Sequence, residues 1–184
     1  MYKKGKKNWF RSIVKGTQKK KAVKEVFIFL IKFNILLIPF YAIIYFDVSF
    51  YILQIAFTNF IASILNLMGY QTSTSDFFLF LGESQYPIDI SRDCLGWKSM
   101  YSLFALVFAT SGLIKDKLKF LAVWVPVLFV VNIFRVLITM LVGLNLGFQY
   151  LEFIHTFLWQ GIMIIALVLV WYVWLRRGNL IGKK

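Results

Sequence analysis

The chain has 184 residues, of which 60% are hydrophobic, including 20 Phe, 9 Tyr and 6 Trp. A soluble domain of this size cannot bury so much apolar surface, because its surface-to-volume ratio forces many polar residues outward. This composition excludes a soluble globular enzyme and a disordered chain, and it leaves an integral membrane protein. The net charge of +13 then indicates membrane orientation and contact with anionic lipid, and we expect no nucleic-acid partner.

Lys and Arg gather in three clusters. Ten of the 21 lie in residues 1–24, three lie in 115–119, and four close the chain. Because basic residues flank the cytoplasmic ends of membrane spans, we expect all three clusters inside the cell. No small-residue cleavage site follows the first apolar run, so we expect the basic head to remain in the mature chain. The pattern predicts a basic cytoplasmic tail over 1–24, a membrane-embedded domain over 25–175 and a basic cytoplasmic C-terminus over 176–184.

Five apolar runs follow the basic head, each close to the roughly 20 residues that a helix needs to cross a bilayer core of about 30 Å. They are 26–46, 48–69, 94–114, 120–144 and 153–175. If both flanking basic clusters are inside, the chain between them crosses an even number of times, so one of the first three runs does not cross fully. We expect this of 48–69, whose polar residues form one stripe typical of an interfacial or re-entrant helix. The stripe consists of Gln54, Thr58, Asn59, Ser63 and Asn66. A complete span with the stripe facing the bundle interior is the alternative.

The predicted fold is an all-α integral membrane helical bundle of about four to five transmembrane helices in the cytoplasmic membrane. A short β-hairpin is expected outside the cell, before Cys94. Phe77–Leu81 and Tyr86–Ser91 flank a Gly-containing tetrapeptide, which is typical of two paired strands. Pro87 restricts the second strand to an edge.

Arg135 lies inside an otherwise apolar run, in its outer third by the expected topology. A charge at such depth is costly, and such residues normally face a partner or a water-filled cavity. Asn132 and Thr139 lie three residues before and four residues after it, on the same helical face. We interpret Arg135 as an anion- or oxyanion-binding residue. The alternative is a structural Arg that reaches outward to the interface or pairs with a carboxylate elsewhere in the chain.

Cys94, the only Cys, opens the third run at its outer end. Asp93 is expected to act as an N-cap that places the thiol on the first turn of a helix. The helix N-terminus and Lys98 would then stabilise a thiolate. A single Cys forms no internal disulfide, and with only one His the usual zinc ligand sets are missing. We therefore expect no metal and no cofactor.

His155, the only His, opens the last run at its outer end, and Glu152 one turn earlier is placed to orient the imidazole. The topology puts Cys94, Arg135 and His155 on three different runs at one depth near the outer face. A thiol, a fixed cation and an imidazole are the nucleophile, the oxyanion stabiliser and the acid/base that thiol acyl transfer requires.

These residues resemble the exosortase/archaeosortase family of membrane transpeptidases. The match consists of Cys-x-Gly in the segment Asp93–Ser99, then Asn-x-x-Arg over Asn132–Arg135, then His155 before the final run, within a resemblance that covers residues 45–175. The residue after Cys94 is Leu95, where many relatives have a small polar residue. The resemblance implies sortase-like chemistry on an unrelated fold. It implies partners that are exported proteins ending in a short motif, a membrane helix and a basic cluster, and it implies either a lipid or another acceptor for the new C-terminus.

The expected mechanism is covalent. The Cys94 thiolate attacks the scissile carbonyl to form a thioester, Arg135 stabilises the oxyanion, and His155 protonates the leaving amine and then activates the acceptor. Asn132, Glu152, and the backbone N–H groups of Leu95 and Gly96 are expected to support them. We also expect the polar stripe of 48–69 to line a substrate groove and the hairpin to add a substrate strand.

Two other functions remain open at this point, and two more are disfavoured. With water as the acceptor, the same site would act as a hydrolase. A non-catalytic membrane scaffold or assembly factor would make Cys94 dispensable. A small transporter or channel is disfavoured because the sequence has neither internal repeats nor a continuous polar path, and a membrane metalloprotease is disfavoured because His-Glu-x-x-His is missing.

Overall fold

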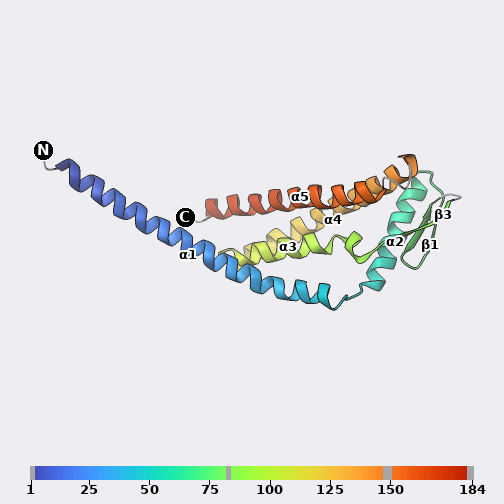
Figure 1. Cartoon of the computed structure of the whole chain (residues 1–184), viewed down its shortest axis with the longest axis horizontal. Coiled ribbons are helices and arrows are strands. Elements are labelled where there is room, and N and C mark those ends of the chain that lie inside the picture. Colours follow the sequence, from blue (N-terminus) through green and yellow to red (C-terminus); the bar gives the residue numbers. More distant parts are fainter. Residues whose placement is uncertain (1–2, 82–83, 147–150, 182–184) are drawn as a thin grey trace.

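The computed structural model describes the backbone of residues 3–81, 84–146 and 151–181, and the side chains of 20–21, 23–81, 87–145 and 161–177. The described chain is mostly helical, with one small antiparallel sheet (Figure 1). The elements in chain order are α1 (Lys3–Tyr45), α2 (Tyr51–Leu67), β1 (Thr72–Ser75), β2 (Phe78–Leu81), β3 (Ser84–Asp89), the 3-10 helix η1 (Arg92–Leu95), α3 (Trp97–Ala109), α4 (Ile114–Leu146) and α5 (Leu151–Ile181).

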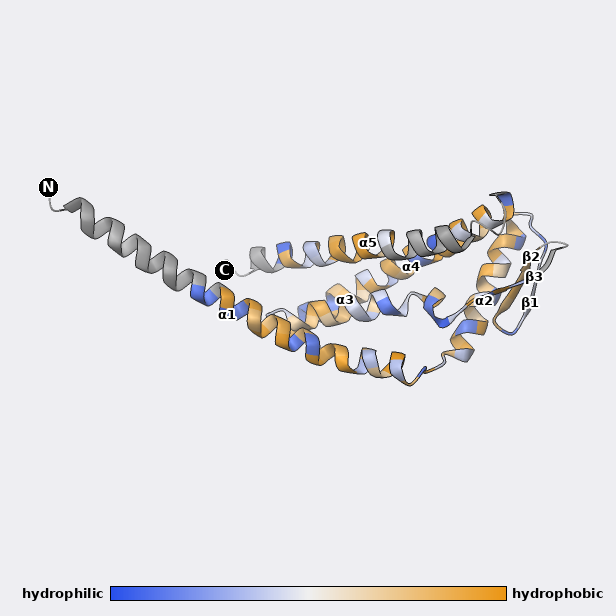
Figure 2. Ribbon diagram, in the orientation of Figure 1, coloured by the Kyte–Doolittle hydropathy of each residue, from blue (hydrophilic) through white to orange (hydrophobic). Residues whose placement is uncertain are grey.

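Two helices within the described residues are long and apolar enough to cross a membrane, Val23–Tyr45 and Ile114–Asn145. Hydrophobic residues run along α1 beyond its basic positions, and along α4 (Figure 2). Because α1 is continuous from Lys3, the boundary expected between a tail and a membrane domain after residue 24 lies inside one helix. The chain is therefore a membrane protein whose basic head leads directly into its first span.

The helix α2 runs across the end of the bundle formed by α3, α4 and α5, and the sheet lies beyond it (Figure 1). Its 17 residues reach about 25 Å, which is shorter than a bilayer core of about 30 Å. The interfacial position of α2 in the membrane stays a prediction.

The apolar run 94–114 supplies a shorter helix than expected, because glycine-dependent turns bound it at both ends. At the start Gly96 has φ +73°, and beyond the end Gly112 has φ +141°, conformations that glycine adopts without the steric cost of a Cβ. The intervening α3 has 13 residues, or about 20 Å. In contrast, α4 begins at Ile114 and takes the basic cluster 115–119 into its first turns.

The sheet has the strand order β1-β2-β3, with antiparallel pairing throughout. The pairing of β2 with β3 corresponds to the predicted strand pair, and Pro87 lies on the edge strand β3 as expected. Residues 82–83 of the predicted turn lie outside the described residues. The strand β1 was not predicted, since its sequence Thr-Ser-Thr-Ser has no alternation of apolar and polar residues.

The polar stripe of α2 faces the sheet. The Asn66 Oδ1 accepts hydrogen bonds from the Thr72 backbone N–H and hydroxyl, both at 2.9 Å, and the Thr74 hydroxyl donates to Asn59 Oδ1 at 2.9 Å. The expectation that this stripe lines a substrate groove is wrong. Its side chains supply the hydrogen bonds that a strand of small polar residues cannot obtain from apolar packing.

Two groups of buried side chains form the core. One joins α2, the sheet, η1 and the later part of α4, and its most buried members are Ile61, Leu65, Leu79, Leu81, Ile90 and Val136. The other joins α3, α4 and α5, and its most buried members are Leu103, Val107, Leu128 and Phe120. The first group includes Cys94 itself, so the packing of the sheet and α2 against α4 fixes the position of the thiol.

Candidate active site around Cys94

Cys94 lies in the single turn η1, between β3 and α3, outside both membrane spans. The N-cap of this turn is Ser91, whose carbonyl accepts a hydrogen bond from the Cys94 N–H at 2.9 Å. The expectation that Asp93 caps a helix opening at Cys94 is therefore wrong. Gly96 is the reason, because its left-handed backbone ends η1 and makes it the N-cap of α3.

The two predicted motifs meet at Gly96 and Asn132. The Asn132 Nδ2 donates a 2.7 Å hydrogen bond to the carbonyl oxygen of Cys94, and Asn132 is fully buried. A Cβ at position 96 would lie 2.7 Å from Cγ of Asn132. The Gly96 N–H donates a hydrogen bond to the Asp93 carbonyl at 3.3 Å. This N–H therefore stabilises the turn and does not point to a ligand. Cys-x-Gly and Asn-x-x-Arg thus form one packed unit.

Arg135 follows Asn132 by one turn of α4 and is only 4% exposed. Its positive charge acts on Cys94, which is itself 5% exposed. Burial is the largest influence and raises the pKa of the Cys94 thiol. A hydrogen bond with the Ser91 hydroxyl (3.7 Å) and the Arg135 charge lower it, while Asp89 and Asp93 raise it further. The net result is a buried, protonated thiol with a raised pKa and a guanidinium close enough to favour its thiolate.

Lys98 forms a salt bridge with Asp93, with Nζ 2.6 Å from Oδ2. This pair joins the first turn of α3 to the residue before Cys94. Lys98 was predicted to act on the thiolate, whereas the structure gives it this bond to Asp93.

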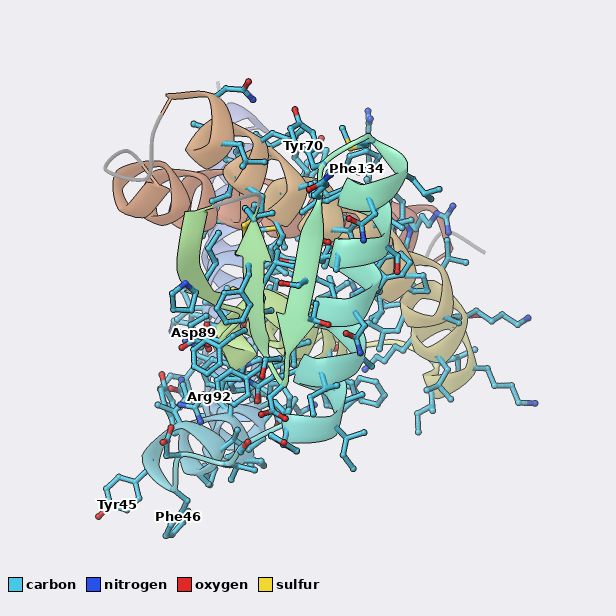
Figure 3. The ribbon with its side chains drawn as sticks, turned by 90° about the vertical axis from the view of Figure 1, so that its right-hand side faces the viewer. Tyr45, Phe46, Tyr70, Asp89, Arg92 and Phe134 are labelled. Atoms are coloured by element: carbon cyan, nitrogen blue, oxygen red, sulfur yellow. The ribbon has the colours of Figure 1, made fainter. Side chains whose placement is uncertain are left out.

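Three further residues hold the segment before Cys94, and no sequence pattern predicted them in this role. Ser91 contacts the thiol, and Gln54 of α2 donates through Nε2 to the carbonyl of Ile90 at 3.3 Å. Arg92 reaches the loop after α1, where it bonds Asp47 Oδ1 at 2.8 Å and the Val48 carbonyl at 3.1 Å. In Figure 3, Arg92 lies between Asp89 and the end of α1 that carries Tyr45 and Phe46. Only their proximity to Cys94 in sequence could have singled out Ser91 and Arg92.

The side chains of His155 and Glu152 lie outside the described residues. Both residues belong to the first turns of α5, which begins at Leu151. The start of α5 lies at the end of the bundle that carries the sheet (Figure 1). Their roles remain predictions.

An apolar pocket of about 520 Å³ opens beside the turn that carries Cys94. Its wall comes from the apolar face of α2, from the start of α3 and from α4. The lining residues are Phe50, Leu53, Ala56, Phe57, Phe60, Leu95, Trp97, Met100 and Phe129. Leu95 directly follows Cys94, so the pocket adjoins the turn that carries the thiol. Among the residues whose side chains are described, no group of three or more His, Cys, Asp or Glu is placed to hold a metal ion.

Residues 20–172 match the model of the transmembrane exosortase family. Comparison with curated proteins and with solved structures gave no match. The matched region begins near the end of the basic head and includes all of the site described above. It covers most of the chain, and the chain therefore belongs to the transmembrane exosortase family.

Proposed function

We propose that this protein is a membrane cysteine transpeptidase that cleaves the C-terminal sorting signals of exported proteins at the outer face of the cytoplasmic membrane. The substrates end in a short motif, a membrane helix and a basic cluster. The observation that supports this most directly is the buried Cys94 with the Arg135 charge acting on its thiol and Asn132 holding its carbonyl. Membership of the exosortase family supports an exosortase-like membrane function and this kind of substrate.

The proposed reaction has two steps. The Cys94 sulfur, as thiolate, attacks the scissile carbonyl carbon, and the C–N bond breaks to leave a thioester and an amine that takes its proton from His155. The acceptor then gives a proton to His155 and attacks the thioester, which releases the thiolate. Arg135 stabilises the oxyanion that forms in both steps, in a buried position where a fixed charge acts more strongly than in water.

The raised pKa of Cys94 has a consequence for this mechanism. In the resting protein the thiol is neutral, so a base must take its proton when substrate binds, and His155 is the residue that we assign to this task. The Arg135 charge reduces the cost of forming the thiolate in a buried site. A thiol kept neutral until then is also less open to oxidation.

The apolar pocket is suited to bind an apolar segment of the substrate. Its wall is formed almost entirely by carbon, and it adjoins Leu95 and Trp97. We assign it to the residues at the start of the substrate membrane helix, which must lie close to the scissile bond. The acceptor is either a lipid or water, and the mass of the processed C-terminus distinguishes the two.

The test is co-expression with an exported reporter that carries a tripartite tail encoded in the same genome. Cys94→Ala should abolish processing, and Arg135→Ala should slow it by about 100-fold, as expected for loss of an oxyanion donor. Lys119→Met, on the exposed face of α4, is the matched control and should process normally. Equal membrane levels of all variants are verified by immunoblot. Processing that persists in Cys94→Ala excludes the covalent mechanism and favours the scaffold interpretation.

A further inference from the structure

The outer edge of β3 carries backbone groups that point away from the sheet. The Ile90 N–H bonds the Phe77 carbonyl at 3.0 Å, and the register pairs Ile88 with Leu79 and Asp89 with Phe78. This bond makes Ile90 and Phe77 a hydrogen-bonded pair. Hydrogen-bonded and non-hydrogen-bonded pairs alternate along an antiparallel ladder, so Asp89 with Phe78 is a non-hydrogen-bonded pair and Ile88 with Leu79 is a hydrogen-bonded pair. The N–H and C=O of Asp89 and the C=O of Pro87 therefore face outward.

The opposite edge of the sheet is already covered. The strand β1 lies against α2, and the Thr72 N–H that points away from β2 is bonded to Asn66 Oδ1 at 2.9 Å. Figure 3 shows β1 next to α2 and β3 on the far side of the sheet. Within the described residues, no hydrogen bond is made to the outward backbone groups of Pro87 and Asp89. Only the β3 edge is thus open to pairing in this part of the chain.

The open edge leads directly to the nucleophile. Cys94 follows Asp89 by five residues, which is at most about 17 Å of extended chain. The intervening segment is held by the Ile90 carbonyl bond to Gln54 (3.3 Å), and its Ser91 hydroxyl contacts the Cys94 thiol (3.7 Å). A peptide paired with β3 would therefore continue to the reacting sulfur along a fixed segment of chain.

We propose that the β3 edge is the recognition surface for the segment of the sorting signal next to the scissile bond, which binds as an added strand. This inference rests on the proposed function and concerns how its substrate is held. The occupant is an extended peptide, because only another strand offers N–H and C=O groups at the spacing of Asp89 and Pro87. Pro87 offers an acceptor and no donor, so the pairing is confined to Asp89 and to the Pro87 carbonyl.

The first test substitutes residues of the β3 edge and measures processing of the co-expressed reporter described above. Asp89→Pro removes the outward N–H and leaves the bonds to β2 in place, and it should lower the processing rate at least tenfold. Asp89→Asn also removes the charge but keeps the N–H, so processing by Asp89→Pro should be at least tenfold slower than processing by Asp89→Asn. Lys119→Met, the exposed control on α4 described above, should process normally.

The second test uses the purified protein and a synthetic peptide that spans the cleavage site mapped in the reporter. Single N-methyl groups are moved along its backbone. Pairing with β3 predicts loss of cleavage at every second position and tolerance at the positions between, because only alternate residues of a strand face its partner. Cleavage that is insensitive to N-methylation, or that is lost equally at all positions, overturns the inference.

The outcomes separate this inference from the proposed function. If the wild type processes the reporter, Cys94→Ala does not, and Asp89→Pro matches the wild type, the strand proposal fails and the transpeptidase proposal stands. If the wild type and Cys94→Ala process the reporter equally, the proposed function fails, and the inference fails with it.

Discussion

Asn132 occupies the space that a side chain at position 96 would need, since its Cγ lies 2.7 Å from where a Gly96 Cβ would be. The same amide holds the Cys94 carbonyl at 2.7 Å. One residue of α4 thereby holds Cys94 and packs against the glycine that ends its turn. This relationship explains why a glycine two residues after the cysteine and an asparagine on a distant helix occur in one sequence.

Gly96→Ala should destabilise the fold by about 2–4 kcal/mol, which combines the cost of a left-handed backbone with that of overpacking. The free energy of unfolding is measured in detergent by chemical denaturation. Gly69→Ala is the control, because Gly69 has φ +92° but nothing within 4 Å of its added Cβ. It should lose only about 1–2 kcal/mol. Equal losses at the two positions would show that contact with Asn132 does not matter.

Asn132→Ala should cost about 1–3 kcal/mol, since it leaves the buried Cys94 carbonyl without its donor. It should also relieve part of the Gly96→Ala penalty, so the double variant should lose less than the sum of the single losses. Asn145→Ala on the same helix is the matched control. It removes a 2.7 Å bond to Leu141 that is exposed, and its loss should stay below about 0.5 kcal/mol. Strictly additive losses would contradict the geometry.

Alkylation of Cys94 should respond to pH as a buried thiol does. Because burial raises the pKa of the thiol, the thiolate forms at higher pH than in an ordinary cysteine, and the alkylation rate should still be rising where an exposed thiol has reached its plateau. Ser91→Ala removes an interaction that lowers this pKa. It should therefore move the midpoint to still higher pH.

Arg135→Gln should move the midpoint of the same profile upward as well, and Arg135→Lys should move it less, because Lys keeps the charge. A small maleimide and mass spectrometry give the rates. Equal profiles for Arg135→Gln and the wild type would show that the guanidinium does not act on the thiol. A shift to lower pH would contradict the assigned sign.

The membrane helices and two of the site residues could be predicted from sequence, because they depend on composition and on the helical spacing of apolar and polar residues. The apolar runs predicted a membrane protein with helices, and the scarcity of Cys and Arg at apolar positions singled out Cys94 and Arg135. The stripe on α2 was visible as a helical period. The strand that the stripe contacts, β1, could not be predicted, because it is a run of Thr and Ser without a hydrophobic pattern. This strand depends on hydrogen bonds with Asn59 and Asn66.

The turn that carries the thiol could not be predicted for a different reason. Asp93 before an apolar run has the pattern of an N-cap, and nothing local shows that Gly96 adopts a left-handed conformation. The space beside Gly96 is filled by Asn132, which lies 36 residues away in the sequence. The apolar pocket could not be predicted either, because its wall combines residues from three helices that are distant in sequence. In the sequence, these residues look the same as side chains that face lipid.

Lys117→Met should destabilise the fold by about 2 kcal/mol, although Lys117 belongs to a basic cluster that the sequence assigns to the cytoplasm. Its side chain is 6% exposed and donates to the carbonyls of Phe108 (3.1 Å) and Thr110 (2.6 Å), which end α3. The loss follows from leaving these carbonyls without a charged donor. Lys119→Met, two residues further on and exposed, is the control and should be neutral. Equal stability of the two variants would show that Lys117 does not cap α3.

The orientation of the bundle predicts which engineered cysteines are accessible from outside the cell. Leu67 at the end of α2 and Leu113 before α4 are 89% and 71% exposed, and each is replaced by Cys in a Cys94→Ala background. The basic cluster 115–119 should hold Leu113 on the cytoplasmic side. A membrane-impermeant maleimide should therefore label Leu67→Cys in intact cells and label Leu113→Cys only after lysis. The reverse pattern would place the end of the bundle that carries Cys94 inside the cell, where it could not act on exported proteins.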